Sequence, residues 1–255
     1  MYRITAAEMM SCQEEYKKNY PSFKPFSMST ADSDHIINNF KGILKTQNGR
    51  DTDDYCIEDD NKVERYLSKF PKGSDVLFLG TGTGRELLIA KDMGFNPVGT
   101  TLGSRNVFYG REYLGLTEME LIECPNEALP FTRGSFDVVT GFQVFEHAMA
   151  PMQFLLEQYR VLKEGGTLLL EWPAAKFHQG GDNPHHQVCY VPGQAKSLLE
   201  KASFSGIKLY YSDMTDVAED DMWRGDTGDE NLMLCVEGTK VPSQQEYIRN
   251  YLKSR

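Results

Sequence analysis

The feature that most constrains the fold is a glycine-rich turn between an apolar run and a helix-forming segment. Residues 76–85 read VLFLGTGTGR, and Gly80, Gly82 and Gly84 fill the turn. Glycine lets a chain turn tightly and lets a ligand come close to the backbone, and the helix that follows offers free N–H groups. The stretch therefore predicts a strand, a ligand-binding turn and a helix at the front of a sheet.

Short apolar runs alternate with helix-length segments after Asp75. The expected strands are 76–80, 97–101, 119–124, 136–142, 166–172, 206–211 and 231–238, and the expected helices between them are 85–93, 104–114, 151–163 and 192–202. This alternation predicts an α/β, Rossmann-like fold with a seven-stranded, mostly parallel sheet and helices on both faces. No helix is expected between the last two runs, so the last strand is predicted to be antiparallel.

Three parts of the chain are expected from these patterns. Residues 1–72 are predicted to form a helical N-terminal extension that acts as a lid, because apolar residues such as Ile36, Phe40 and Leu44 recur at helical spacing. Residues 73–240 are predicted to form the ligand-binding domain. Residues 241–255 are predicted to form a C-terminal helix or tail.

Charge and composition narrow the partners. The 255 residues carry a formal net charge of −10, which disfavours nucleic acid and anionic membranes as partners. No apolar run approaches the roughly 20 residues that a membrane span requires, and the first residues lack a signal-peptide core, so a cytoplasmic protein is expected. The five cysteines form no CxxC pair, which argues against a disulfide framework and a zinc site.

Spacing and order give the chain a resemblance to a known family. The third glycine of the turn comes four residues after the first, which departs from the GxGxxG dinucleotide pattern. The segment LGTGTGRELLIAKDMGF resembles motif I of class I S-adenosylmethionine (SAM) dependent methyltransferases. Three later segments are similar to that family in the same order, chiefly to its small-molecule, ubiquinone-biosynthesis-like group: NEALPFTRGSFDVVTGFQVFEHAMAP, FLLEQYRVLKEGGTLLLEWP and HHQVCYVPGQAKSLLEKASF.

The resemblance implies SAM as cofactor and a set of residues around it. The implied positions follow the ends of the first, second and fourth strands and the adenine loop. They are Gly80, Thr81, Gly82 and Gly84 in the turn, Thr101 and Leu102 by the ribose and adenine, Asn126 and Glu127 beside the adenine, and Phe142 and Gln143 at the end of the fourth strand.

The sequence departs from the family at three acidic positions. Phe78, Thr101 and Pro125 stand where the family usually carries an acid. A hydrogen bond to a charged group contributes about 1.5–3 kcal/mol and a neutral one about 0.5–1.5 kcal/mol, so the threonine at the ribose position predicts roughly tenfold weaker cofactor binding. The departures leave two alternatives open. One is a degenerate methyltransferase fold retained as a binding or scaffold protein. The other is an NADP-dependent oxidoreductase, with Thr101, Ser104 and Arg105 holding the 2′-phosphate.

Histidines supply the candidate catalytic groups. Methylation of a hydroxyl requires a base, and histidine titrates near neutral pH. His147 ends the fourth strand, whereas His185 and His186 lie in the loop after the fifth. Their spacing matches no standard metal motif, so no metal is expected. The sequence GFQVFEH lacks the motif of DNA amino-methyltransferases. We therefore expect methylation of a small-molecule acceptor at oxygen or carbon, with the acceptor and the oligomeric state left open.

Overall fold

The computed structural model describes residues 62–174, 186–223 and 232–241. The chain divides into two compact units, Met1–Arg65 and Tyr66–Arg255, and the described residues lie almost wholly in the second. A helix covers residues 62–67. Most of the expected N-terminal extension and of the expected C-terminal tail lies outside the described residues, so both stay predictions.

The described part alternates strands with helices as the apolar pattern predicts. The elements in chain order are β1 (Asp75–Leu79), α4 (Arg85–Asp92), β2 (Asn96–Thr101), α5 (Ser104–Leu114), β3 (Leu121–Glu123), β4 (Phe136–Phe142), the 3-10 turn η1 (Phe145–His147), α6 (Pro151–Val161), β5 (Leu162–Pro173), α7 (Pro192–Lys201), β6 (Phe204–Tyr211), the 3-10 turn η2 (Glu219–Asp221) and β7 (Met233–Lys240).

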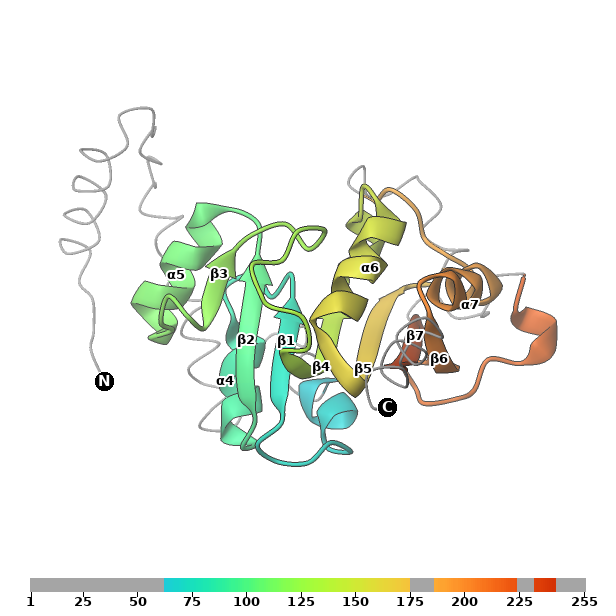
Figure 1. Ribbon diagram of the computed structural model, residues 1–255, viewed down its shortest axis with the longest axis horizontal. Helices are drawn as coiled ribbons and strands as arrows, with labels where there is room; N and C mark the ends of the chain where they lie inside the picture. The colour runs from blue at the N-terminus through green and yellow to red at the C-terminus, as the bar shows by residue number, and fades with distance from the viewer. Residues whose placement is uncertain (1–61, 175–185, 224–231, 242–255) are drawn as a thin grey trace, which may run out of the picture. The chain divides into compact units, whose positions relative to one another are not determined.

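The strands form one seven-stranded sheet in the order β3-β2-β1-β4-β5-β7-β6 (Figure 1). β1 pairs in parallel with β2 and β4, whereas β7 is antiparallel to both of its neighbours, β5 and β6. The predicted fold class is confirmed, including the antiparallel last strand. Because β1 and β4 are neighbours and β2 lies on the other side of β1, the chain reverses its direction of travel across the sheet at β1, where ligands bind in such folds.

Helices cover both faces of this sheet. Successive residues of a strand point to opposite faces. Leu168 and Leu170 of β5 pack in the core cluster that also holds α6 and α7 residues, whereas Leu169 packs with Tyr66 on the other face. In β2, Val98 packs toward the first cluster, and Gly99 lies against Leu87 of α4 on the opposite face. The continuous apolar runs of the sequence are thus strands buried on both sides.

Several boundaries differ by a few residues from the sequence expectation, two of them for identifiable local reasons. α6 ends at Val161 rather than at 163, and Leu162 already pairs with Phe136 of β4, so β5 starts four residues before the expected position 166. β3 starts at Leu121 rather than Met119, because the N–H groups of Glu120 and Leu121 both donate to the carbonyl oxygen of Thr117.

Among the described residues, no helix is both long and apolar enough to cross a bilayer.

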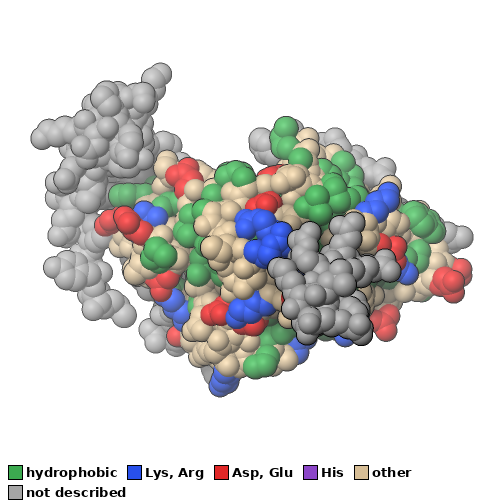
Figure 2. Space-filling model, viewed as in Figure 1, with side chains coloured by type: hydrophobic (Ala, Val, Ile, Leu, Met, Phe, Trp, Pro, Cys, Tyr) green, Lys and Arg blue, Asp and Glu red, His purple; other side chains and the backbone are tan. Residues whose placement is uncertain are grey.

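Acidic and basic side chains are interspersed on the face in Figure 2, and hydrophobic side chains gather over α6. Leu156 of α6 and Met149 just before it are exposed. At the amino edge of the sheet, Lys163 pairs with Asp75 and Asp137 at 2.8 and 2.9 Å.

Candidate functional site

The glycine turn after β1 has the backbone that its sequence predicts. Gly80, Gly82 and Gly84 adopt φ of +62°, +56° and +88°, in the left-handed region that glycine occupies without strain. The N–H of Thr81 donates to the Thr100 oxygen at 2.9 Å, which ties the turn to β2. A Cβ at Gly82 would meet nothing within 4 Å, so the turn is open on that side. A ligand can approach the backbone there.

The third glycine packs against protein rather than facing the open side. A Cβ at Gly84 would lie 2.4 Å from Leu116 Cδ1. In α5, a Cβ at Gly110 would lie 2.3 Å from the backbone oxygen of Thr83. These two glycines let α4 and α5 lie close to the turn. Gly84 therefore packs against Leu116 at the base of the turn, and its cofactor-binding role stays a prediction.

Polar groups at the end of β2 connect to the loop between β3 and β4, residues 124–135, which is called the adenine loop here because the family resemblance implies that role. Thr101 is buried at the last position of the strand, and its Oγ1 accepts from Asn106 Nδ2 at 3.3 Å. Thr100 Oγ1 donates to the side-chain oxygen of Asn126 at 2.8 Å. Leu102, directly after β2, is 67% exposed. The side-chain oxygen of Asn126 is thus bound to Thr100, and Leu102 offers an exposed apolar side chain at the end of β2.

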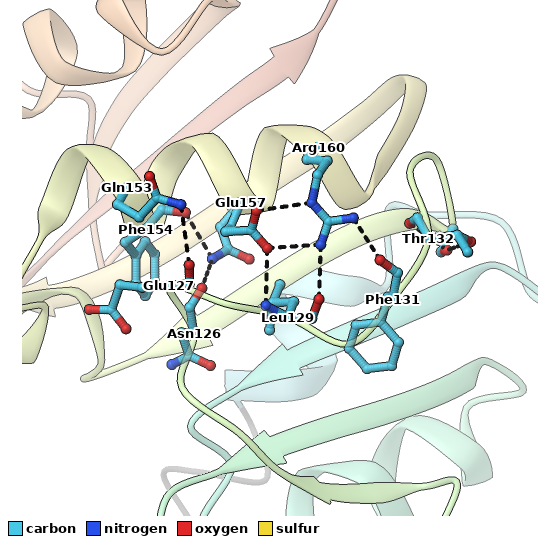
Figure 3. A network of polar contacts seen from close by, with 11 residues as sticks. Asn126, Glu127, Leu129, Phe131, Thr132, Gln153, Phe154, Glu157 and Arg160 are labelled. Carbon is cyan, nitrogen blue, oxygen red and sulfur yellow. Dashed lines mark hydrogen bonds and ion pairs between the residues drawn. The ribbon is translucent and has the colours of Figure 1, made fainter.

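The adenine loop is fixed to α6 by a network of polar contacts (Figure 3). Arg160 donates to the carbonyl oxygens of Phe131 at 2.6 Å and Leu129 at 2.9 Å. Glu157 accepts from Arg160 and from the Leu129 N–H, and the guanidinium lowers the pKa of this carboxyl. Gln158 Nε2 donates to the backbone oxygen of Asn126 at 2.8 Å, and Gln153 Nε2, one turn earlier in α6, donates to the backbone oxygen of Glu127 at 3.4 Å.

This network predicts that Arg160→Leu weakens both stability and cofactor binding. Loss of the hydrogen bonds to two loop carbonyls is expected to lower the free energy of unfolding by about 1–3 kcal/mol. Freeing the loop is expected to weaken S-adenosylhomocysteine binding roughly tenfold, measured by calorimetry. Lys163→Met, which removes two ion pairs at the amino edge of the sheet but no contact to the loop, is the control and should leave binding unchanged. Equal losses of affinity in both variants would contradict a local effect.

The end of β4 carries a strained residue. Gln143 has φ of +55° although it is not glycine, a conformation that persists only where the surroundings enforce it. Its N–H donates to the Glu171 oxygen at 2.8 Å, and its Nε2 lies 3.5 Å from Glu171 Oε1. The ring of Phe142 stacks on Tyr66, with centroids 5.6 Å apart. Phe142 thus packs on the Tyr66 face of the sheet, and Gln143 turns the chain at the carboxyl edge.

A buried polar group adjoins Gln143 on that face. The carboxylate of Glu171 is fully buried and accepts from the Tyr66 hydroxyl at 2.6 Å, and the same hydroxyl lies 3.0 Å from Cys235 Sγ. Further along the sheet, Tyr210 of β6 donates to Glu237 of β7 at 2.5 Å. Burial, together with the adjacent carboxylates, raises the pKa of Tyr66 and Tyr210 far above the ordinary tyrosine range. An acid inside the apolar run GTLLLEW is a sequence signal for such a group.

Two of the three predicted catalytic histidines come together. The rings of His147 in η1 and His186 after β5 lie 4.8 Å apart between centroids, edge to face. Glu146, which is fully buried, joins them: one ligand atom from each of the three residues lies within 4.8 Å of the others. His185 lies outside the described residues. The sequence-based expectation of no metal rested on linear spacing. Spacing along the chain does not show that Glu146, His147 and His186 lie close together in the fold.

Phe78, at one of the three positions where the family usually carries an acid, is buried in the sheet. A carboxylate lies at the turn from another position: Glu86, in the first turn of α4, accepts from Thr81 Oγ1 at 2.6 Å. No sequence motif pointed to Glu86.

Comparisons with known proteins agree with this geometry. Residues 77–170 match the family described as a methyltransferase domain. A probable S-adenosylmethionine-dependent methyltransferase from Mycolicibacterium smegmatis is 31% identical over 165 residues, which cover 63% of this chain and 63% of the relative. A ubiquinone/menaquinone biosynthesis C-methyltransferase from Xanthomonas oryzae is 37% identical, over 42% of this chain and 49% of the relative. The chain thus spans less than two thirds of these curated relatives.

A solved structure shares the fold. The phosphoethanolamine N-methyltransferase 2 of Haemonchus contortus, determined with S-adenosylhomocysteine, superposes with a TM-score of 0.58 at 15% identity, over 72% of this chain and 52% of that one. At this identity the likeness concerns the fold alone. The resemblance to class I S-adenosylmethionine-dependent methyltransferases is therefore confirmed by the matched domain over residues 77–170 and by the sequence relatives, and for the fold by this structure.

Proposed function

We propose that this protein transfers the methyl group of SAM to a small-molecule acceptor, at oxygen or carbon. The observation that carries the proposal is that the open glycine turn, the end of β2 and the end of β4 meet at one edge of the sheet, where His147 and His186 also lie together. Cofactor-binding backbone and candidate proton acceptors thus share the edge at which such folds bind ligands.

Each portion of SAM would contact a different segment of the site. The backbone at Gly80–Gly82 would lie under the methionine portion, since the open side at Gly82 leaves room for it. Thr101 and Leu102 would face the ribose and adenine, and Asn126 Nδ2 with Glu127 would flank the adenine. The adenine loop needs no rearrangement to do so, because α6 already holds its backbone.

A histidine would act as the base during methyl transfer. The methyl group moves from sulfur to the acceptor as the sulfur–carbon bond breaks, and S-adenosylhomocysteine leaves. With a hydroxyl acceptor, His147 or His186 would take the proton from oxygen as the oxygen–methyl bond forms. The relative named as a quinone C-methyltransferase supports a small acceptor, and carbon methylation needs the same base to remove the ring proton.

Calorimetric titration of the full chain with S-adenosylhomocysteine, alongside NADPH, tests the cofactor half. We expect a micromolar dissociation constant for S-adenosylhomocysteine and no heat from NADPH. Gly82→Val is expected to weaken binding about 100-fold or more, because a β-branched residue at φ +56° is strained and its side chain would fill the open side of the turn.

Gly165→Val is the matched control for that variant. Gly165 also has a positive φ, +79°, with no atom within 4 Å of its Cβ position, but it lies at the amino end of β5, away from the proposed site. It should lose stability like Gly82→Val and still bind. Binding of NADPH alone would establish the oxidoreductase alternative, and binding of neither ligand up to millimolar concentration would establish the scaffold alternative.

A further inference from the structure

We propose that Glu146, His147 and His186 form a binding site for a divalent transition-metal ion. Each residue contributes one ligand atom, and the three atoms lie within 4.8 Å of one another. Ligand atoms around a bound zinc ion are roughly 3.4 Å apart, so side-chain shifts of about 1 Å would bring these three atoms to a common centre.

The backbone holds the two segments of this site together. Glu146 and His147 belong to η1, where the N–H of His147 donates to Val144 and that of Ala148 donates to Phe145. The carbonyl oxygen of Glu146 accepts from the N–H of Gln187 at 2.7 Å and of Val188 at 3.3 Å. The residue that supplies the carboxylate thus also anchors the loop that supplies His186.

Aromatic packing fixes both segments to the sheet. Phe145, between the end of β4 and Glu146, is buried against Phe154 of α6 and Trp172 of β5, with ring centroids 5.2 and 5.3 Å away. It also stacks on Tyr190 at 5.1 Å, and Trp172 Nε1 donates to the Tyr190 oxygen at 3.1 Å. η1 and the 186–190 segment therefore contact each other through Phe145 and Tyr190, and both contact Trp172. A preorganised ligand site requires such support.

The donor set selects the class of ion. Two imidazoles and one carboxylate suit zinc, iron(II), cobalt(II) and related ions, whereas magnesium and calcium prefer oxygen ligands throughout. Carboxylates that are fully buried, as Glu146 is, are generally paired with charge or coordinate a metal. Three protein ligands leave one or more positions open for water or a substrate atom, the arrangement of catalytic rather than structural zinc sites.

The open position would face the methyl acceptor, a role that rests on the proposed function. A bound divalent ion lowers the pKa of a coordinated hydroxyl and holds its oxygen in place. The acceptor would then reach the SAM methyl group as an alkoxide or phenolate, with its proton lost to water. In that case His147 and His186 act as ligands rather than as the base. Metal binding itself does not depend on SAM.

Titration of the metal-free full chain with Zn²⁺ and with Co²⁺ tests the site. We expect one ion per chain, and a Co²⁺ complex with ligand-field absorption in the visible range. His147→Ala and His186→Ala are each expected to weaken binding at least 100-fold. Val188→Ala is the matched control in the same loop and should bind like the wild type. No stoichiometric binding, or binding that neither histidine substitution weakens, would overturn the proposal.

Titration of the same variants with S-adenosylhomocysteine separates the two proposals. His186→Ala should keep the wild-type affinity for this ligand, which also shows that the variant is folded. Glu146→Gln is expected to lose metal binding as well, and His186→Ala decides the outcome if Glu146→Gln does not fold. Metal binding without S-adenosylhomocysteine binding would overturn the proposed function alone. The reverse result would overturn the metal site alone.

Discussion

Replacement of Gly110 by alanine is expected to lower the free energy of unfolding by about 2–3 kcal/mol and to weaken S-adenosylhomocysteine binding. Helix propensity alone predicts a higher free energy of unfolding, because alanine in a helix interior is favoured over glycine by about 1 kcal/mol. Packing outweighs it here, since the new Cβ would lie 2.3 Å from the backbone oxygen of Thr83 and 2.4 Å from Leu121 Cδ2. A backbone oxygen cannot rotate away, so α5 or the glycine turn has to move.

Chemical denaturation and calorimetry of Gly110→Ala give the two readouts. Gly115→Ala is the control at the end of the same helix. Gly115 has φ of +68° and an open surrounding, so alanine there is expected to cost only about 1 kcal/mol and to leave binding unchanged. A stabilised Gly110→Ala protein would show that α5 does not press on the turn.

The second large effect is a loss of stability at alkaline pH. Tyr66 and Tyr210 are buried beside Glu171 and Glu237, which raises their pKa in the folded protein, whereas an unfolded tyrosine titrates near 10.0. Above pH 10 the unfolded chain therefore releases two protons that the folded chain retains. The free energy of unfolding is expected to fall by about 1.4 kcal/mol per pH unit for each tyrosine, and their stabilising contribution is fully present below that pH.

Denaturation curves of the wild type and of Tyr66→Phe/Tyr210→Phe between pH 7 and 11.5 measure this slope. The double variant is expected to be less stable at pH 7, because it loses two hydrogen bonds to buried carboxylates. Its stability should nevertheless fall by about 2.8 kcal/mol less per pH unit above pH 10. The pH 7–9 range, where tyrosine does not titrate, is the internal control. If the free energy of unfolding of the two proteins fell with the same slope above pH 10, the raised pKa of these two tyrosines would be wrong.

The architecture of the described domain followed from local pattern. Runs such as VLFLG and FDVVTGF have the length and the continuous apolar character of strands buried on both faces, and each became a strand. The left-handed backbone of the glycine turn was equally predictable, because only glycine adopts it freely. What local pattern missed are boundaries that depend on a partner: Leu162 is a strand residue because Phe136 lies beside it.

The site was less predictable, because its groups are far apart in the sequence. The residues of the glycine turn could be assigned from the order of family motifs. The approach of His186 to Glu146 and His147, however, depends on how the loop after β5 folds back on η1. The Tyr66–Glu171 contact joins a helix before β1 to the fifth strand, and no spacing rule connects them. Such contacts arise from the tertiary fold alone.

The position of β7 has a consequence for folding during synthesis. β7 lies between β5 and β6, so among the described strands β6 pairs only with β7, which follows it in the chain. Until Met233–Lys240 has been synthesised, β5 presents an open hydrogen-bonding edge, and β6 lacks this partner. Open strand edges can pair with other chains. A nascent chain that ends before residue 233 is therefore more exposed to edge-to-edge aggregation than the finished domain.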